Sequence, residues 1–395
     1  MKRVVHLTTQ WPTIYQTFVR ADIEISRDYF DSVAIIGPFL KSRDQIPILR
    51  ENSSLKSFLL ICARVFSLRR NELHALLIIC RHTGVLKTLY ILVSAFRVIH
   101  KANISSYPSQ VTVHAHFLSN STKIALTIKL LFPEITFIAT GHGSDVFFNQ
   151  PCMLNLFVKC ADYILCASKA VEISIKDALK TDHQQKCSIL VRYCRSFYNK
   201  PEIFDVGHFQ GGALKIVTVG RMTFQKGWDI TCKTASLLKS SGVKFQWVFI
   251  GDGELLSEMK ALCWSLGLTD EISFKGALAH DEVIKYINLA DLVVCPAIVH
   301  NKESDGLPVV ILEAMSMSKV VISNDVGGIS EALSNDRGVI VLPSPENFRN
   351  SILKVISGEI DGESIAKNAK AWVEANCSFG EDDPLAHVYD GISKI

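Results

Sequence analysis

Two cations follow the first strand that we expect in the second half of the chain. Arg221 comes directly after Gly220, and Lys226 stands in the segment Phe224-Gln225-Lys226-Gly227, which opens a helix. The free N–H groups and the dipole of a helix N-terminus already favour an anion. Arginine adds a bidentate fork and lysine a point charge, so the pair suits a diphosphate. A turn with two solvated cations is the alternative interpretation of the same pattern.

Glycine-rich turns end two later strands of this half. Gly251-Asp252-Gly253 is a tight turn that allows a close approach of another backbone. Gly327-Gly328 lies in a strand-to-helix turn of the kind that opens backbone amides toward a ligand.

Two carboxylates lie between these turns. Asp305 and Gly306 precede an apolar helix that we expect to begin at Leu307-Pro308, with Glu313 two turns into it. Positions i and i+8 share roughly one face of a helix, so we expect Asp305 and Glu313 to form a pair. Paired carboxylates can bind sugar or ribose hydroxyls by charge-assisted hydrogen bonds. The alternative is a helix start with an acidic first turn.

Histidines mark two strand ends in the first half. They stand in Thr140-Gly141-His142-Gly143-Ser144-Asp145 and in His114-Ala115-His116. A packed, hydrogen-bonded core residue is the alternative for each of them. Two histidines two apart on a strand share one face, so a metal site is conceivable at His114 and His116. No carboxylate stands nearby in the sequence, and we therefore expect no metal.

These residues require a scaffold in which strands alternate with helices. Such alternation predicts parallel sheets covered on both faces, hence an α/β protein with two doubly wound, Rossmann-like domains facing each other across a cleft. Ligands bind at the carboxyl ends of the strands of such sheets. Pro201 and Gly211-Gly212 predict a linker within 200–212, which divides the chain into domains 1–205 and 206–377. The expected strands are Val4–Leu7, Val33–Ile36, Val111–His114, Thr136–Thr140, Tyr163–Cys166 and Ile189–Val191, then Leu214–Gly220, Phe245–Gly251, Ile272–Lys275, Leu292–Cys295, Val320–Ser323 and Val339–Leu342.

The composition of the 395 residues excludes several classes of protein. A hydrophobic fraction of 48% with 21% charged residues argues against a disordered chain. The 11 cysteines form no C-x-x-C pair, which indicates free thiols in a reducing compartment. No apolar run approaches the ~18 residues of a membrane span, and the apolar run after Arg3 is too short for a signal peptide. We expect a cytoplasmic protein.

The net charge of +3 hides two halves of opposite sign. Residues 1–200 hold 25 Lys and Arg against 13 Asp and Glu, whereas 201–395 hold 17 against 26. A basic domain suggests an anionic partner, and the absence of nucleic-acid-binding motifs argues against DNA or RNA. Segment 55–68 has an amphipathic helical pattern with Lys56 and Arg64 on its polar arc. It predicts either a helix lying in a membrane interface or a helix packed on the sheet.

Together the motifs carry a resemblance to a known family. The order G-R-…-K-G, G-D-G, D-G-x-P-x-x-x-x-E-A-M and G-G-I-x-E within 210–345 resembles the donor-binding domain of retaining family-4 glycosyltransferases of the GT-B fold. The resemblance implies that Arg221 and Lys226 bind the diphosphate of a nucleotide sugar, that Glu313 holds the ribose and that Asp305 faces the donor sugar. The family usually has Glu at the place of Asp305 and Pro at the place of Ser330. The implied donor-binding residues are Gly220, Arg221, Lys226, Gly251, Gly253, Asp305, Gly306, Leu307, Glu313, Gly327 and Gly328.

The first half resembles the family more loosely. Residues 140–145 resemble its T-x-H-G-x-D stretch, which implies that His142 contacts the donor sugar. Residues 9–19 resemble the P-x-x-S-E-T-F-I opening of exopolysaccharide transferases of the colanic-acid type, with Tyr15 and Gln16 replacing Ser-Glu. The segment 378–395 resembles the helix that crosses back to the first domain in this fold. The residues that the resemblance places on the acceptor side are Thr13, Tyr15, Gln16, His116 and Asp145.

The implied reaction is the retaining transfer of a hexose without a metal. No D-x-D triplet occurs, and metal-dependent sugar transferases hold their diphosphate with that motif. We therefore expect no metal or cofactor, fixed positive charge on the leaving group, and His142, Asp305, Arg221 and Lys226 as the catalytic residues. The basic first half suits a saccharide acceptor linked to a polyprenyl diphosphate at the inner membrane surface, as in exopolysaccharide or lipopolysaccharide synthesis. The alternatives are a nucleotide-sugar hydrolase or epimerase of the same fold and an inactive, nucleotide-sugar-binding partner subunit.

Overall fold

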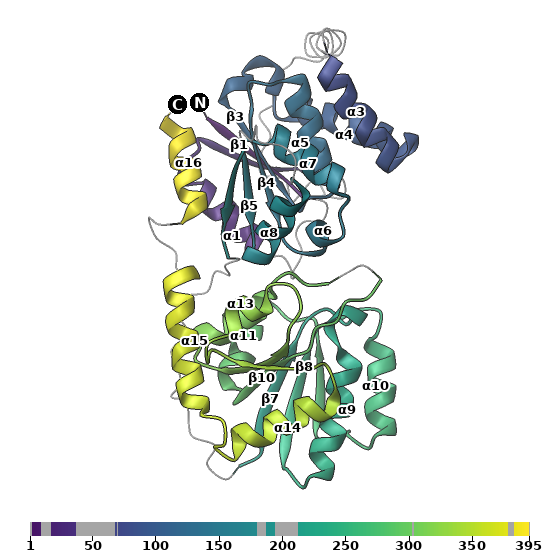
Figure 1. Cartoon of the computed structure of the whole chain (residues 1–395), viewed down its shortest axis with the longest axis vertical. Helices are drawn as coiled ribbons and strands as arrows, with labels where there is room; N and C mark the ends of the chain where they lie inside the picture. Colours follow the sequence, from purple (N-terminus) through teal and green to yellow (C-terminus); the bar gives the residue numbers. More distant parts are fainter. Residues whose placement is uncertain are drawn as a thin grey trace. The chain divides into compact units, whose positions relative to one another are not determined.

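The computed structural model describes residues 2–8, 17–36, 68, 70–179, 187–193, 212–301, 304–377 and 383–394. The chain divides into two compact units, Met1–Arg192 with Phe379–Ile395 (unit 1) and Tyr193–Ser378 (unit 2). Each unit is a parallel sheet between helices (Figure 1). The domain boundary expected at 205/206 lies outside the described residues, as do 200–211 of the expected linker and 55–67 of the amphipathic segment.

Within its described residues, unit 1 has one six-stranded sheet in the order β2-β1-β3-β4-β5-β6. Its strands are β1 (Arg3–Leu7), β2 (Ser32–Ile36), β3 (Val111–His116), β4 (Thr136–Gly141), β5 (Tyr163–Cys166) and β6 (Ser188–Val191). Its helices are α1 (Thr17–Ser26), α3 (Arg70–Thr83), α4 (Val85–Lys101), α5 (Asn120–Leu131), α6 (Ser144–Phe147), α7 (Pro151–Cys160), α8 (Lys169–Ala178) and α16 (Pro384–Lys394).

Two hydrophobic layers cover this sheet because neighbouring residues of a strand point to opposite faces. Val5 and Val113 pack with helices α4, α5 and α7 on one face. Val4 and Ile138 pack on the other face with Ile23 of α1 and with α16. The C-terminal helix α16 thus belongs to the core of unit 1, and Figure 1 shows it in yellow beside α1.

A buried ion-pair network joins three parts of unit 1. The Arg192 guanidinium lies 2.5 Å from Asp22 of α1 and 2.8 Å from Asp383, which directly precedes α16. Asp383 also accepts the backbone N–H of Leu385 at 2.9 Å. Since all three charged side chains are buried, the network is closed to water and holds the start of α16 against α1.

Unit 2 has a second parallel sheet, with the order β12-β11-β10-β7-β8-β9 over its described residues. Its strands are β7 (Leu214–Val219), β8 (Phe245–Ile250), β9 (Ile272–Gly276), β10 (Leu292–Cys295), β11 (Val320–Asn324) and β12 (Val339–Val341). Its helices are α9 (Trp228–Ser240), α10 (Leu256–Ser265), α11 (His280–Leu289), α12 (Val309–Ser316), α13 (Ile329–Leu333), α14 (Pro345–Ile356) and α15 (Gly362–Cys377).

The α/β fold expected from the sequence is confirmed in both units, and the expected strands end within two residues of those found. Fully buried parallel strands read as apolar, β-branched runs, which is why the sequence reveals them. In unit 2, β7 lies between β8 and β10, and β10 pairs with β11. This order brings the loops that follow β7, β8, β10 and β11 to one edge of the sheet, where the predicted site residues stand. No helix of the described residues has the length and apolarity to span a bilayer.

Candidate functional site

The loop after β7 forms the centre of the candidate site in unit 2. Lys226 ends a short 3₁₀ turn at Phe224–Lys226, and its ammonium lies 2.7 Å from the carboxylate of Asp305. A Cβ on Gly220 would stand 3.3 Å from the Lys226 side chain, so the glycine gives the lysine stem its room. The Arg221 side chain is exposed, and its carbonyl accepts the indole N–H of Trp228 at 2.9 Å. One cation is therefore held in place, and the other extends into water.

The Gly251-Asp252-Gly253 turn approaches the β7 loop as closely as the sequence predicts. Gly251 has φ 144°, and a Cβ there would stand 1.8 Å from the carbonyl oxygen of Gly220. Gly253 has φ 156°, and a Cβ there would meet the carbonyl of Met222 at 2.6 Å. No side chain fits at either position, so both glycines are needed to bring the β7 and β8 loops together.

A second close approach joins the loops after β10 and β11. Gly327 has φ 60°, and a Cβ there would lie 2.3 Å from the carbonyl oxygens of both Asp305 and Gly306. The amide of Gly328 donates to the Gly306 carbonyl at 2.6 Å. Leu307 is buried and anchors this loop in the core. The Gly327-Gly328 turn therefore positions the backbone that carries Asp305.

The expected Asp305–Glu313 pair is not formed. Helix α12 begins at Val309 after Pro308, so Asp305 lies in the preceding loop and the helical-face argument does not apply. Glu313 is buried and its Oε1 lies 2.8 Å from His280 Nε2 at the start of α11. Each carboxylate thus has its own cationic or hydrogen-bonding partner.

His280 is a site residue that the sequence reasoning missed. It opens α11 directly after the loop that follows β9, and it meets Glu313 across 33 residues of chain. A histidine at the first turn of a helix after a strand end is a weak signal. Only the packing of α11 on α12 gives it a partner.

In unit 1, the His142 loop is held by a carboxylate. Asp145 Oδ1 accepts the amides of His142 at 3.0 Å and Gly143 at 2.7 Å, and its Oδ2 accepts the amide of Leu118 at 2.7 Å. Burial raises the pKa of Asp145, and these amide bonds oppose that rise. Asp145 therefore positions the loop through backbone contacts. Its direct contact with an acceptor stays a prediction.

The His142 ring contacts two aromatic side chains that also contact each other. Its centroid is 4.3 Å from that of Phe18 and 4.6 Å from that of Phe117. Burial and the charge of Arg192 lower the pKa of His142 to about 3, so the imidazole is neutral near pH 7. A neutral imidazole can donate or accept a hydrogen bond to a hydroxyl. Its contact with a donor sugar remains a prediction.

We expect the free energy of unfolding to fall as the pH drops below 6.5, because His142 has a lower pKa in the folded chain than in the unfolded chain. The unfolded imidazole takes up a proton near pH 6.5 and the folded one only near pH 3, so acid favours the unfolded chain in this range. Urea denaturation at pH 7.5 and pH 5.0 measures the effect. Between pH 7.5 and pH 5.0, the free energy of unfolding of His142→Gln should fall by about 1–2 kcal/mol less than that of the wild type. Equal losses in both proteins would contradict the prediction.

The described structure contains only two of the residues expected on the acceptor side, His116 and Asp145. Thr13, Tyr15 and Gln16 lie outside the described residues. The placement of His116 on the acceptor side needs correction, because its side chain is 0% exposed and its Nε2 lies 3.0 Å from His6 Nδ1. A buried imidazole bonded to another histidine is not available to an acceptor.

The comparison with known families identifies the second unit. Residues 199–372 match the family described as Glycosyl transferases group 1. The chain contains a glycosyl transferases group 1 domain. This match runs from before β7 into α15, and thus covers Lys226, Asp305 and the two glycine turns.

Several relatives of this domain are described as glycosyltransferases. Alpha-D-kanosaminyltransferase of Streptomyces kanamyceticus is 28% identical over 44% of this chain and 45% of its own length. Amylovoran biosynthesis glycosyltransferase AmsK of Erwinia amylovora is 27% identical over 41% of this chain and 40% of its own length. The putative colanic acid biosynthesis glycosyltransferase WcaL of Escherichia coli is 26% identical over 41% of this chain and 41% of its own length. The matched region spans less than half the length of each of these relatives.

Solved structures share the fold over the whole chain. The sucrose-phosphate synthase of Thermosynechococcus elongatus has a TM-score of 0.68 at 16% identity, covering 100% of this chain and 98% of its own. Anabaena Alr3699/HepE, solved in complex with UDP and glucose, has a TM-score of 0.64 at 14% identity, covering 100% and 99%. The fold is that of the GT-B glycosyltransferases.

Proposed function

We propose that this chain is a retaining glycosyltransferase that moves a sugar from a nucleotide sugar to a saccharide acceptor in surface polysaccharide synthesis. The observation that carries the proposal is the Lys226–Asp305 pair, which lies in loops that the glycine turns bring into close backbone contact. The resemblance to colanic-acid-type enzymes and the relatives AmsK and WcaL support the substrate class.

The proposed chemistry follows from fixed charge at the β7 loop. Lys226 and Arg221 neutralise the nucleoside diphosphate as it leaves, and the buried Glu313 accepts hydrogen bonds from the ribose. Asp305 orients the Lys226 ammonium and faces the donor sugar. The leaving phosphate accepts the proton of the attacking hydroxyl, so the reaction needs neither a protein nucleophile nor a metal at the diphosphate.

A thermal-shift screen of the purified chain against UDP, GDP, ADP and their sugars tests the donor site. We expect one nucleotide to raise the melting temperature, because saturation at 100 times Kd adds about 2.7 kcal/mol to the stability. Lys226→Ala should lose most of that shift, and Lys233→Ala, which removes an exposed lysine of α9, should keep it. A shift that is unchanged in Lys226→Ala would contradict the assignment.

Product analysis separates the proposed transferase from its alternatives. Release of free sugar without an acceptor would indicate a nucleotide-sugar hydrolase. Conversion of the bound sugar into its epimer would indicate an epimerase. Nucleotide binding with no turnover against any lipid-linked or soluble saccharide would indicate an inactive partner subunit.

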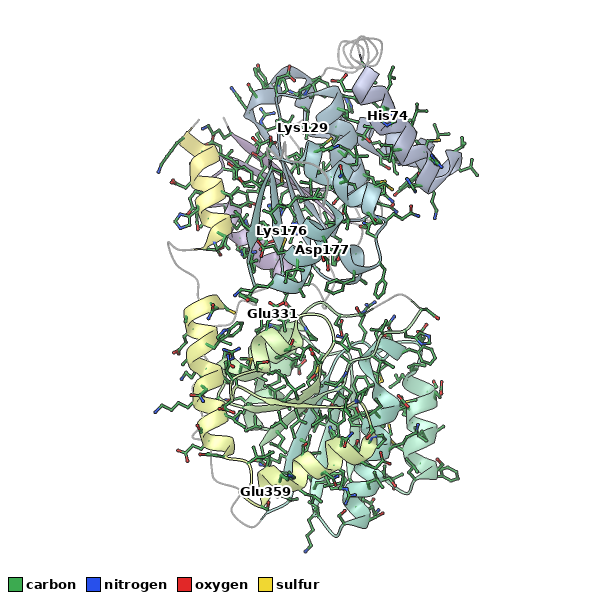
Figure 2. The ribbon with its side chains drawn as sticks, viewed as in Figure 1. His74, Lys129, Lys176, Asp177, Glu331 and Glu359 are labelled. Carbon is green, nitrogen blue, oxygen red and sulfur yellow. The ribbon has the colours of Figure 1, made fainter. Side chains whose placement is uncertain are left out.

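We further propose that the acceptor is lipid-linked and that helices α3 and α4 meet the membrane. Both helices carry large apolar side chains on their exposed sides, and Figure 2 marks α3 by His74. The exposed cations Arg81, Lys87 and Arg97 lie on the same two helices. Exposed apolar side chains and cations on the same helices match an anionic lipid interface. The α3–α4 surface consists of Leu73, Leu77, Val85, Leu86, Leu89, Tyr90 and Val93.

Replacing two leucines of the α3–α4 surface should reduce binding to lipid vesicles. Leu77 is 66% exposed and Leu86 is 84% exposed, so Leu77→Glu with Leu86→Glu leaves the core intact. We expect at least about tenfold weaker co-sedimentation with phosphatidylglycerol vesicles at low salt, because each buried leucine contributes about 1.5–3 kcal/mol. The matched control is Leu289→Glu, 57% exposed in unit 2. Equal binding of all variants, or no binding by the wild type, would contradict the proposal.

A further inference from the structure

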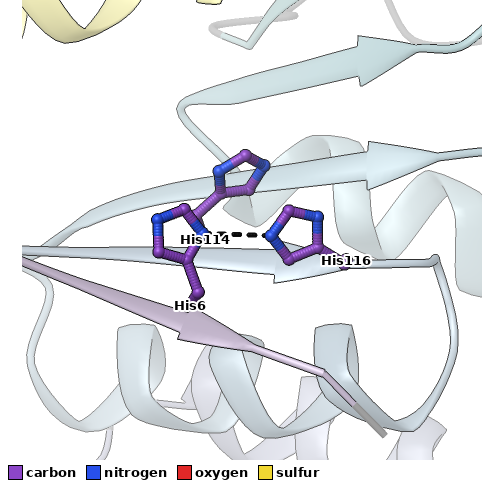
Figure 3. A group of neighbouring side chains, drawn as sticks. All are labelled: His6, His114 and His116. Carbon is purple, nitrogen blue, oxygen red and sulfur yellow. Dashed lines mark hydrogen bonds between the residues drawn. The ribbon is translucent and has the colours of Figure 1, made fainter. Parts of the chain in front are cut away.

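Three histidines of unit 1 meet inside the protein (Figure 3). His6 of β1 and His114 of β3 are register partners, and His116 follows two residues later on the same face of β3. All three side chains are 0% exposed. One ring nitrogen from each lies within 4.8 Å of those of the other two. None of the three has a part in the proposed transfer reaction.

The hydrogen bonds around His6 define its tautomer. The Ser26 hydroxyl donates to the carbonyl of Ile23 at 2.7 Å, so it can only accept from His6 Nε2, which lies 3.1 Å away. In the neutral ring the proton is therefore on Nε2, and Nδ1 carries a lone pair. That lone pair faces His116 Nε2 at 3.0 Å.

A neutral His116 ring cannot make favourable contacts with both His6 and Asp22. If Nε2 donates its proton to His6, the lone pair on Nδ1 is buried without a hydrogen-bond partner and lies 3.7 Å from the Asp22 carboxylate. If Nδ1 carries the proton toward Asp22, the two lone pairs of His6 and His116 face each other at 3.0 Å. Each neutral arrangement leaves an electrostatic conflict between buried side chains.

We propose that a divalent transition-metal cation, with Zn²⁺ as the representative ion, binds between His6 Nδ1 and His116 Nε2 with His114 as the third ligand. The cation removes the lone-pair conflict and allows His116 Nδ1–H to point toward Asp22. A metal-bound histidine commonly directs its other N–H to a carboxylate in this way. Imidazole is a preferred ligand of zinc.

The ligand geometry of zinc is compatible with the site. Zinc–nitrogen bonds of about 2.1 Å at tetrahedral angles separate two ligand nitrogens by about 3.4 Å. The His6 and His116 nitrogens must move apart by a few tenths of an ångström, and both rings must turn so that their lone pairs point at the ion instead of at each other. His114 must release one hydroxyl, either Tyr389 at 2.7 Å or Thr140 at 2.8 Å.

The structure also removes the sequence argument against a metal here. No carboxylate stands near His114 and His116 in the sequence, but α1 brings Asp22 to 3.7 Å from His116. The site lies wholly in unit 1, whereas the proposed diphosphate-binding residues belong to unit 2. The role of the ion would be structural, because its ligands come from both β1 and β3. The proposal does not depend on the proposed function.

Metal analysis of the full-length chain, free of any histidine tag, tests the proposal. After treatment with a chelator, exposure to Zn²⁺ and gel filtration, we expect about one zinc per chain by mass spectrometry and a higher melting temperature. His6→Gln and His116→Gln should retain at most about a tenth of that zinc. His74→Gln, an exposed histidine of α3, should retain all of it. A wild-type chain that retains no zinc and shows no rise in melting temperature would overturn the proposal.

A second measurement distinguishes the site from the cysteines without relying on the folding of variants. Cys152 Sγ lies 3.0 Å from His82 Nε2 at the surface, so this pair is the competing zinc site. We expect the Co²⁺-loaded wild type to show visible bands without the near-ultraviolet absorption of a cobalt–thiolate bond, and Cys152→Ser to keep its zinc. Thiolate absorption, or loss of zinc in Cys152→Ser, would contradict the assignment to the histidines.

Discussion

Lys226→Ala should lower kcat by about 10²–10³-fold, which is the usual effect of removing one fixed donor to a developing oxyanion. In the proposed reaction the Lys226 ammonium neutralises the departing diphosphate. Its partner Asp305 has a side chain that is 25% exposed and can be hydrated once the lysine is lost. We therefore expect the melting temperature without nucleotide to change little. Steady-state kinetics with the nucleotide sugar identified by the thermal-shift screen measure the effect.

Two variants make the Lys226 result specific. Lys226→Arg keeps the positive charge and should recover part of the lost rate, although its planar fork differs in shape from the ammonium. Lys233→Ala removes a lysine that is 53% exposed and pairs with Asp229 within α9, and its rate should equal that of the wild type. A Lys226→Ala enzyme with full kcat would remove the diphosphate-binding role.

Arg192→Met should destabilise unit 1 by about 3–5 kcal/mol, because it leaves two buried carboxylates without their cation. Asp22 is 1% exposed and Asp383 is 2% exposed, so water cannot replace the guanidinium. The loss should loosen α16, whose first turn Asp383 anchors through the amide of Leu385. Urea unfolding followed by circular dichroism measures the stability, and hydrogen exchange over α16 locates the loss.

A surface ion pair of the same unit is the control for Arg192. Arg27→Met removes an arginine that is 51% exposed and pairs with Glu24, and we expect a change below about 1 kcal/mol. Asp383→Asn in the Arg192→Met background should recover part of the stability by removing one unpaired charge. Similar losses in Arg27→Met and Arg192→Met would show that burial of the network is not the source of the effect.

Much of the fold and part of the site follow from local sequence. Buried parallel strands are short apolar runs between turn residues, and each of the runs that we predicted as a strand is one in the described structure. The Gly251 and Gly253 turn was predictable because only glycine allows the backbone of Gly220 and Met222 to come so close. Lys226 and Asp305 can be predicted as candidate site residues because they follow strands of a parallel sheet at their carboxyl ends, and their role stays a prediction.

Other features depended on long-range packing. Asp305 bonds to Lys226 across 79 residues because β7 lies next to β10 in the sheet, and Glu313 meets His280 because α11 packs on α12. The spacing of Asp305 and Glu313 predicts a pair only if the helix begins at Leu307-Pro308. The first helical residue is Val309, so Asp305 lies outside the helix. Local patterns contain no information on which loops the strand order brings together.

Local sequence patterns are enough to predict the two α/β units, their strands and the glycine turns, since these follow from the conformations and burial of neighbouring residues. Which charges and rings meet depends on the packing of distant segments. This packing joins Arg192 to Asp22 and Asp383, and it places His6 against His116 across 110 residues. The physical reason is that a side chain in the core is partnered by whatever the neighbouring strand or helix presents, and that neighbour is set by sheet order and packing.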